Sequence, residues 1–212
     1  YTGELYKQNS NRSEKLYALS VDIAAPVDGR SDVHTVYRDL IGKVVVEENS
    51  VIEGSKLVKF SVDHAQSEQK ATVEVKEGKV LFSLTSKGVT KTAEEKLGDS
   101  LVISANFGRF VLENWEKIKK GDTIKFRYAA WQRRETVGFE IFKTVEEKNG
   151  SETVIAVKMK PSNFIISALV KPLLFKYSED GSKIVGLNGR VPPMEKSGEG
   201  FKDLDAEVVY FY

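Results

Sequence analysis

The feature that most constrains the fold of this chain is a repeated alternation of apolar and polar residues. Alternation of this kind places successive side chains on opposite faces of a sheet, and it predicts β-strands with one apolar face. The expected strands include residues 17–23, 58–62, 71–75, 80–84, 124–128, 137–141, 153–159, 184–187 and 208–212. Turn signals such as Glu77-Gly78 and Asn149-Gly150 separate several of them. Because short turns join antiparallel neighbours, we expect about ten strands in one antiparallel sheet.

Residues 106–120 break this alternation and have apolar residues at helical spacing. The apolar positions of this segment are Phe107, Phe110, Val111, Trp115 and Ile118. That stripe predicts one long amphipathic helix. Ser104 or Asn106 can cap its start, and Gly121 stands where a helix commonly ends. A second, short helix is expected over residues 163–170.

A sheet of this size must bury one of its faces. Strongly twisted sheets of about ten strands curl or close, so a flat sheet is unusual. We therefore expect a mainly β fold, in which a strongly curved antiparallel sheet, a half-barrel or open barrel, wraps around the long helix. The helix alone cannot cover the inner face, so residues 163–175, the sheet itself or a ligand must fill the remainder. No linker, repeat or composition shift divides the chain, which indicates a single domain over residues 1–212.

Composition limits the chemistry that the chain can carry. The absence of cysteine excludes disulfides, thiolate metal sites and cysteine nucleophiles, and the chain has only two histidines. The net charge of +1 provides no field that would attract nucleic acid. No apolar run reaches the roughly 20 residues that a membrane-spanning helix needs. Nucleophile-elbow and phosphate-binding glycine motifs are absent from the sequence as well. We therefore predict no enzyme activity, no metal site, no cofactor and no nucleic-acid partner.

Arginines gather near aromatic residues in one part of the chain. Arg127, Arg133 and Arg134 lie on or beside the aromatic residues of segment 126–131. Proteins that bind single-stranded nucleic acid combine such groups. Acidic residues follow directly in the sequence, however, and argue against nucleic acid. Two interpretations of the arginines then remain, a solvated outer face of the sheet or a contact between an arginine and a ligand headgroup.

Two further groups of polar residues have both a structural and a functional interpretation. Asp203 and Asp205 could form the carboxylate pair of a hydrolase or part of a cation site. Acidic residues at alternate positions of a strand more commonly form one solvated face. His34 and His64 are expected to be surface or structural residues, because no partner for acid–base chemistry stands at a suitable spacing.

Several segments in the second half of the chain resemble an uncharacterised family of exported bacterial proteins. These segments are Asn106–Trp115, Phe126–Phe139, Met159–Ile166, Gly189–Pro193 and Asp203–Ala206. The resemblance extends over residues 100–212 and implies an exported protein without an assigned activity. In outline, the expected fold is also similar to lipoprotein-carrier half-barrels, in which a curved sheet and a helical lid hold acyl chains. That likeness is one of architecture, and architecture alone does not determine function.

The chain begins at Tyr1, and with the resemblance this favours a periplasmic or outer-envelope protein whose signal peptide has been removed. The function we expect is non-enzymatic binding or carriage of an apolar or amphiphilic ligand, a lipid or acyl chain, in the concavity of the curved sheet. The residues expected to bind it are Phe107, Phe110, Trp115, Phe164 and Ile165 in the apolar part, with Arg127 and Arg134 nearer the mouth. Arginine suits an anionic headgroup because its guanidinium forms two parallel hydrogen bonds to a carboxylate or phosphate.

Two alternatives remain open at this point. An envelope scaffold or assembly protein would bind a protein partner through a sheet edge or an apolar patch. A hydrolase would place acidic residues such as Asp203 and Asp205 together in a cleft. The apolar segment 164–175 is expected either to plug the core or to act as a lid that makes peripheral contact with a membrane.

Overall fold

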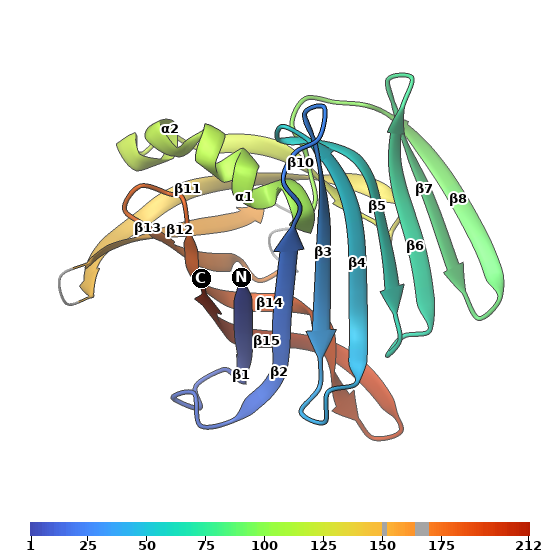
Figure 1. The fold of residues 1–212 in the computed structure, drawn as a ribbon, viewed down its shortest axis with the longest axis horizontal. Helices are drawn as coiled ribbons and strands as arrows, with labels where there is room; N and C mark the ends of the chain where they lie inside the picture. The colour runs from blue at the N-terminus through green and yellow to red at the C-terminus, as the bar shows by residue number, and fades with distance from the viewer. Residues whose placement is uncertain (150–151, 164–169) are drawn as a thin grey trace.

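In a computed structural model, the described residues 1–149, 152–163 and 170–212 form one mainly antiparallel sheet with two helices packed on it (Figure 1). The strands are β1 Thr2–Lys7, β2 Lys15–Ile23, β3 Arg30–Arg38, β4 Val44–Glu53, β5 Lys56–His64, β6 Gln69–Lys76, β7 Lys79–Ser86, β8 Val89–Lys96, β9 Leu101–Val102, β10 Ile124–Ala130, β11 Glu135–Asn149, β12 Glu152–Pro161, β13 Leu173–Ser178, β14 Ile184–Ser197 and β15 Gly200–Phe211. The order in the sheet is β8-β7-β6-β5-β4-β3-β2-β1-β15-β14-β13-β12-β11-β10-β9. Only β9 and β10 pair in parallel among these strands.

The expectation of a mainly β protein with an antiparallel sheet is confirmed, but the sheet has 15 strands rather than about ten. It is neither closed nor strongly curled, so the expected strong curvature is not observed. Among the described residues its end strands β8 and β9 do not pair with each other. The undercount has a physical reason, since strands such as β8 have no buried residue and therefore no apolar alternation.

The two halves of the sheet lie across each other. In Figure 1, β2–β8 run steeply down the view, whereas β10–β15 cross it behind and to the left. We call the face that carries the main apolar cluster the inner face. This cluster takes most of its side chains from β1–β7, and β14 and β15 add Val191, Leu204, Ala206 and Val208. The inner face of β1–β7 therefore packs against part of the inner face of β14 and β15.

A bulge in β14 holds the two halves together. The pairing of β14 with β15 shifts between Val191 and Met194, where two prolines interrupt the ladder. The freed carbonyl groups accept hydrogen bonds from the other half of the sheet. His64 Nε2 lies 2.9 Å from the Pro192 oxygen, and Tyr17 Oη donates to the Met194 oxygen at 2.6 Å. His64 is buried and structural, and its Nδ1 faces the Ser67 hydroxyl at 2.9 Å.

The long helix predicted over residues 106–120 is present as two helices, α1 Ser104–Glu113 and α2 Trp115–Lys120. The break falls at Asn114, whose side chain donates to the Phe110 carbonyl at 2.8 Å. The apolar side of both helices packs on the inner face of β10–β13 in a second cluster. Gly121 ends α2 in the left-handed conformation, as its position predicts. The short helix expected over residues 163–170 falls mainly on residues 164–169, which lie outside the described residues.

Two polar side chains fix the start of α1. Asn106 is fully buried, accepts a hydrogen bond from Ile103 N at 2.7 Å, and donates to the Ser55 and Leu101 carbonyls. Ser104 does not cap its own helix. Its hydroxyl donates to the carboxyl of Glu48 on the inner face of β4, at 2.8 Å.

Glu48 is an acidic residue inside the protein, with 5% of its surface exposed. Burial raises the pKa of its carboxyl from 4.5 to about 7, and the hydrogen bond from Ser104 opposes this shift only in part. A carboxyl whose pKa is raised by folding binds its proton more tightly in the native state than in the unfolded state. Its contribution to stability is therefore complete below pH 4.5 and is lost as the pH rises through about 7.

We predict that Glu48→Gln removes this loss, because an amide accepts the Ser104 hydrogen bond and does not ionise. Relative to the variant, the wild type should lose about 3 kcal/mol of unfolding free energy between pH 4.5 and 8. Urea denaturation at several pH values measures the difference. Glu74→Gln, at an exposed position of β6, is the control. Parallel pH profiles for wild type and Glu48→Gln would contradict the prediction.

Candidate functional site

A groove of about 520 Å³ lies between α1, the β4–β5 turn and the segment that leads from β8 to β9. Its volume falls within the roughly 300–1,000 Å³ typical of small-molecule sites. The apolar residues that line it are Leu57, Val58, Val75, Leu97, Leu101 and Phe110. Polar groups come from Ser55, Ser100 and Asn114. The groove thus combines apolar walls with a small number of polar groups.

Charged residues of both signs complete the lining. The basic residues are Arg30 and Lys56, and the acidic residues are Glu53, Asp99 and Glu113. Arg30 lies 3.4 Å from the Glu53 carboxylate, whereas within the described chain Lys56 has no carboxylate at ion-pair distance. Two positive and three negative groups give the groove a mixed charge with a small acidic excess.

Hydrogen bonds from α1 hold the groove in shape. Asn106 Nδ2 donates to the Ser55 carbonyl at 2.8 Å, and Arg109 donates to the Gly54 carbonyl at 3.1 Å and the Ser31 hydroxyl at 3.2 Å. These bonds join the helix to the β4–β5 turn and to the start of β3. The helix and the turn therefore keep their separation without help from a ligand.

Phe110, one of the residues predicted from the sequence, lines the groove. Phe110 is also buried, and with Phe107 and Trp115 it belongs to the cluster between the helices and β10–β13. The Phe107 ring packs 4.8 Å from Phe175, and the Trp115 ring lies 5.4 Å from Tyr177. In this structure all three aromatic residues of the predicted stripe pack against protein, and Phe110 alone among them also borders the groove.

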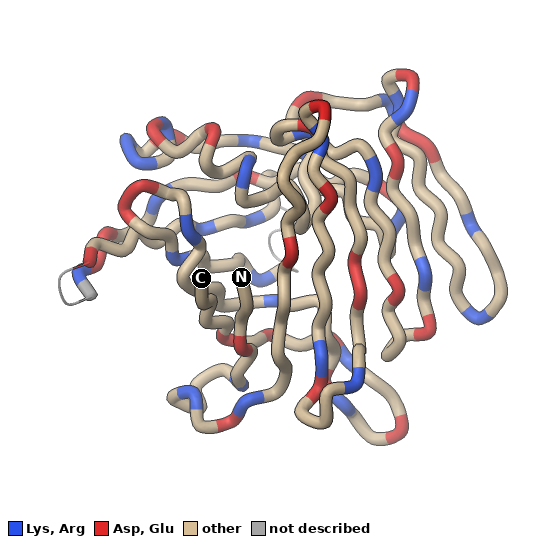
Figure 2. The backbone as a smooth tube through the Cα atoms, in the orientation of Figure 1, with Lys and Arg blue, Asp and Glu red and all other residues tan. Residues whose placement is uncertain are grey.

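The two arginines predicted to stand near the mouth are not among the residues that line the groove, although Arg127 N donates to the carbonyl of Ser100 in the groove wall at 3.1 Å. Arg127 and Phe126 are neighbours on β10, so they project from opposite faces of the sheet. The guanidinium of Arg127 donates to the side chain and carbonyl of Thr136, and Thr136 is also bound to Glu95. Arg134 lies in the β10–β11 turn with a positive φ of 56°. Figure 2 shows basic and acidic residues interspersed along the strands.

The remaining predicted binding residues, Phe164 and Ile165, lie outside the described residues. The groove residues that the sequence did not reveal come from five separate segments, which the β3–β4–β5–β6 pairing and α1 bring together. Two of these segments carry a local signal of a turn, Gly54-Ser55 between β4 and β5 and Gly98-Asp99-Ser100 after β8.

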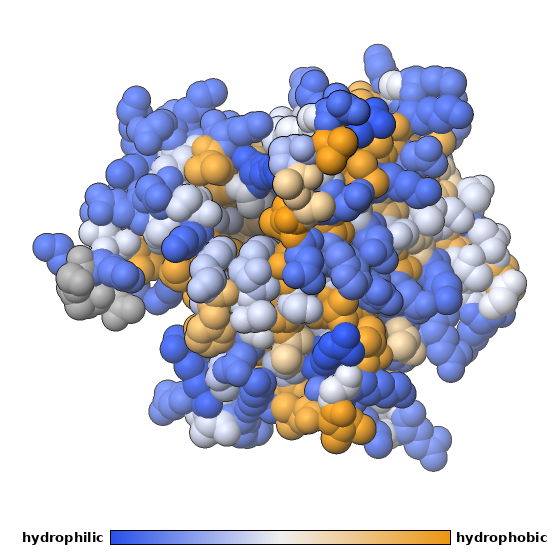
Figure 3. Space-filling view, in the orientation of Figure 1, coloured by the Kyte–Doolittle hydropathy of each residue, from blue (hydrophilic) through white to orange (hydrophobic). Residues whose placement is uncertain are grey.

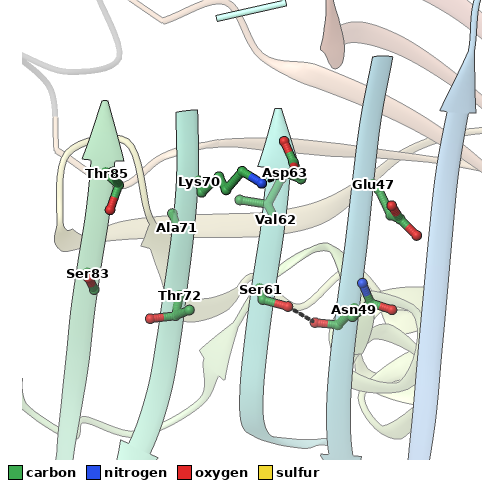
Figure 4. A pocket seen from close by; sticks show the side chains of 10 residues that line it. All are labelled: Glu47, Asn49, Ser61, Val62, Asp63, Lys70, Ala71, Thr72, Ser83 and Thr85. Carbon is green, nitrogen blue, oxygen red and sulfur yellow. Dashed lines mark hydrogen bonds and ion pairs between the residues drawn. The ribbon is translucent and has the colours of Figure 1, made fainter. Parts of the chain in front are cut away.

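A second hollow, of about 310 Å³, lies over the outer face of β4–β7 (Figure 4). Its side chains are mostly short and polar, and Ser61, Thr72 and Ser83 stand opposite one another on successive strands. Lys70 Nζ and the Asp63 carboxylate pair beside them at 2.6 Å. This hollow has the character of a solvated sheet face, so we take the groove beside α1 as the candidate site.

The acidic pair considered for hydrolysis is engaged in ion pairs. Arg190 binds both Asp203 and Asp205, and Asp205 also lies 3.2 Å from Lys171 Nζ. Within the described residues, no group of three or more histidine and acidic side chains is placed to hold a metal ion. None of the helices in the described segments has the length and apolar composition needed to cross a bilayer.

The packing around Trp115 generates a prediction that tests whether this residue is structural. A Cβ at Gly181 would lie 2.3 Å from the Trp115 ring, and Gly181 has a φ of +74°. Gly181→Ala should displace the indole and break its 3.0 Å hydrogen bond to the Glu179 carbonyl. We expect a loss of roughly 2–4 kcal/mol of unfolding free energy, measured by urea denaturation.

The matched control is Gly78→Ala. Gly78 has a φ of +73°, and a Cβ added at this position would have no heavy atom within 4 Å. The Gly78→Ala variant should therefore lose only about 1–2 kcal/mol of unfolding free energy, because of backbone strain. Equal losses of unfolding free energy in the two variants would show that the Trp115 contact contributes nothing to stability.

No family model and no curated protein matches this sequence. Among solved structures, the fold is similar to that of a beta-barrel-like protein of a domain of unknown function, DUF1849, from Brucella abortus. The similarity has a TM-score of 0.58 at 9% identity and covers 98% of this chain and 92% of that chain. At this identity the likeness concerns the fold alone. Function is therefore proposed from the groove.

Proposed function

We propose that this protein binds an apolar or amphiphilic ligand, a lipid or an acyl chain, in the groove beside α1, and that it does so without catalysing a reaction. The observation that carries the proposal is the combination of apolar walls and charged residues in a groove of about 520 Å³. We call these charged residues the rim; they are Arg30, Glu53, Lys56, Asp99 and Glu113. Burial of an acyl chain there would supply roughly 25 cal/mol for each Å² of apolar surface removed from water. The expected setting remains the bacterial cell envelope.

The rim charges define the headgroup that would fit. A purely anionic head would meet Lys56 but also the carboxylates of Glu53, Asp99 and Glu113. A head with both charges, such as phosphoethanolamine, could pair its phosphate with Lys56 and its ammonium with one of the acids. We therefore favour a zwitterionic amphiphile over the simple acyl anion suggested by the arginines near residue 130.

Filling the groove with charged side chains should abolish binding. Val75 and Leu97 line the groove and are half-buried, so Val75→Glu and Leu97→Glu can fold while placing a carboxylate in the path of the acyl chain. We expect at least tenfold weaker binding, the equivalent of about 1.4 kcal/mol. Fluorescence titration with dansyl-labelled undecanoic acid, displaced by lysophosphatidylethanolamine, measures the affinity.

The matched control is Leu81→Glu. Leu81 is also half-buried but lies on β7 away from the groove. Circular dichroism of all three variants verifies folding. If wild-type protein does not bind the probe, or if Leu81→Glu weakens binding as much as the groove variants, the proposal is wrong and the scaffold alternative becomes the better one.

A second prediction tests the headgroup. Lys56→Glu should weaken lysophosphatidylethanolamine about threefold, because it replaces attraction to the phosphate by repulsion at a partly solvated site. Binding of an uncharged monoacylglycerol should stay within error of the wild type. Equal weakening of both lipids would instead indicate a change in groove shape.

A further inference from the structure

Glu48 lies at the point where α1 meets the sheet. Its side chain is buried, although it carries an ionisable carboxyl. Ser104, the first residue of α1, donates to this carboxyl at 2.8 Å and is itself exposed to solvent. Water therefore stands on the other side of the residue that binds the carboxyl. A small displacement of the start of α1 would bring water to Glu48.

The groups nearest to Glu48 supply no compensating positive charge. Tyr37 on β3 and His64 on β5 are its diagonal neighbours on the inner face, and Tyr128 faces it from β10. The two tyrosines are neutral phenols near pH 7, and burial raises the pKa of both side chains further. The buried β14 side chain in the same cluster is Val191, which does not titrate.

His64 and the basic residue of α1 are engaged elsewhere. Nδ1 of His64 accepts a hydrogen bond from Ser67 N at 3.3 Å, and its Nε2 faces the Pro192 carbonyl, which is the pattern of a neutral imidazole. Arg109 donates to the β4–β5 turn and to the start of β3. Within the described chain, Glu48 has no Lys or Arg at ion-pair distance. A negative charge on Glu48 therefore needs water for its stabilisation.

Among the elements around Glu48, α1 is the one that can yield. β3 and β5 are paired with β4 along its length, and moving either would break backbone hydrogen bonds. The first turn of α1 has no acidic residue, and the Ser104 hydroxyl binds Glu48 instead of capping the helix. Gly108 follows one turn later and lowers the helix propensity, although a Cβ there would meet no heavy atom within 4 Å. Figure 3 shows mostly hydrophilic side chains on the outward side of α1 and α2, at the upper left, where solvent borders the helices.

The same turn of α1 joins two walls of the groove. The Asn106 side chain donates to the carbonyls of Ser55 and Leu101, and both of these residues line the groove. Phe110, one turn further along the helix, lines it as well. Displacement of the start of α1 from β4 therefore separates the walls that would enclose an apolar ligand.

We propose that ionisation of Glu48 releases the start of α1 from β4, and that this opening lets a bound ligand leave the groove. The release of a ligand rests on the proposed function, but the opening can be measured without one. The carboxyl has a pKa of about 7 in the closed state and should approach 4.5 once water reaches it. The closed state is therefore favoured most below pH 4.5, and the opened population grows as the pH rises to about 7.

Hydrogen exchange of the free protein measures the opening. Amide protection over Ile103–Phe110 is compared between wild type and Glu48→Gln at the same pH, so that the intrinsic exchange rate cancels. Between pH 5 and pH 8 we expect the wild type to lose at least tenfold in protection relative to this variant. Glu74→Gln, at an exposed position of β6, is the control and should follow the wild type.

A strand distant from the opening separates local motion from global unfolding. β12 carries the fully buried Ile155 and Val157, so its amides should exchange only on global unfolding. In the wild type at pH 8, β12 should stay at least tenfold better protected than Ile103–Phe110. Equal protection of these two segments would overturn the proposal, and so would equal protection of Ile103–Phe110 in wild type and Glu48→Gln at both pH values.

Stopped-flow displacement tests the release of a ligand. Protein loaded with N-phenyl-1-naphthylamine, an uncharged apolar fluorophore, is mixed with an excess of monoacylglycerol at pH 5 and pH 8. We expect the wild type to release the probe at least fivefold faster at pH 8, whereas the rate for Glu48→Gln should change less than twofold. A pH-independent rate in a wild type that opens with pH would overturn the link to the groove. If the probe binds at neither pH, the proposed function fails, and the exchange data alone decide whether α1 opens.

Discussion

The structure depends on one constraint, which is that a sheet of fifteen strands in the described part of the chain carries two apolar clusters that must be kept from water. The two short helices pack mainly on β10–β13 and touch the rest of the sheet only around β4 and β5, so the sheet has to cover much of itself. Crossing its two halves achieves this, because the inner face of β1–β7 then packs against residues of β14 and β15. The groove lies where this mutual cover ends, between α1 and the turn of β4 and β5.

Buried polar groups determine how the parts fit together. The carbonyls released by the β14 bulge bind His64 and Tyr17, and Asn106 satisfies three backbone groups around the start of α1. Each of these bonds would leave a costly unpaired group if the elements were shifted by one residue. Apolar burial drives the association of the two halves, whereas these hydrogen bonds select one arrangement.

Local pattern was enough to predict the fold class, the helical segment and the turn at Gly121. It did not reveal β4 or β8, because β4 carries Glu48 and Ser50 on its inner face and β8 has no buried residue at all. The residues of the candidate site were harder to predict from the sequence than these strands. Phe110 could be anticipated from the helical stripe, but Lys56 and Leu97 reach the groove only because α1 packs beside the β4–β5 turn and the segment between β8 and β9. Arg127 looked suitable on composition, and its strand position places it on the other face from Phe126.

The pairing of β1 with β15 has a consequence for the order of the chain. Each half of the sheet is a series of neighbours in sequence, and only the β1–β15 contact joins the first strand to the last. The Tyr1 and Tyr212 rings stack with centroids 5.0 Å apart. A circular permutant that links these ends and opens between β8 and β9 would therefore run through all fifteen strands in their spatial order. Its most distant strand pairing would become local, so it should fold faster than the native connectivity allows.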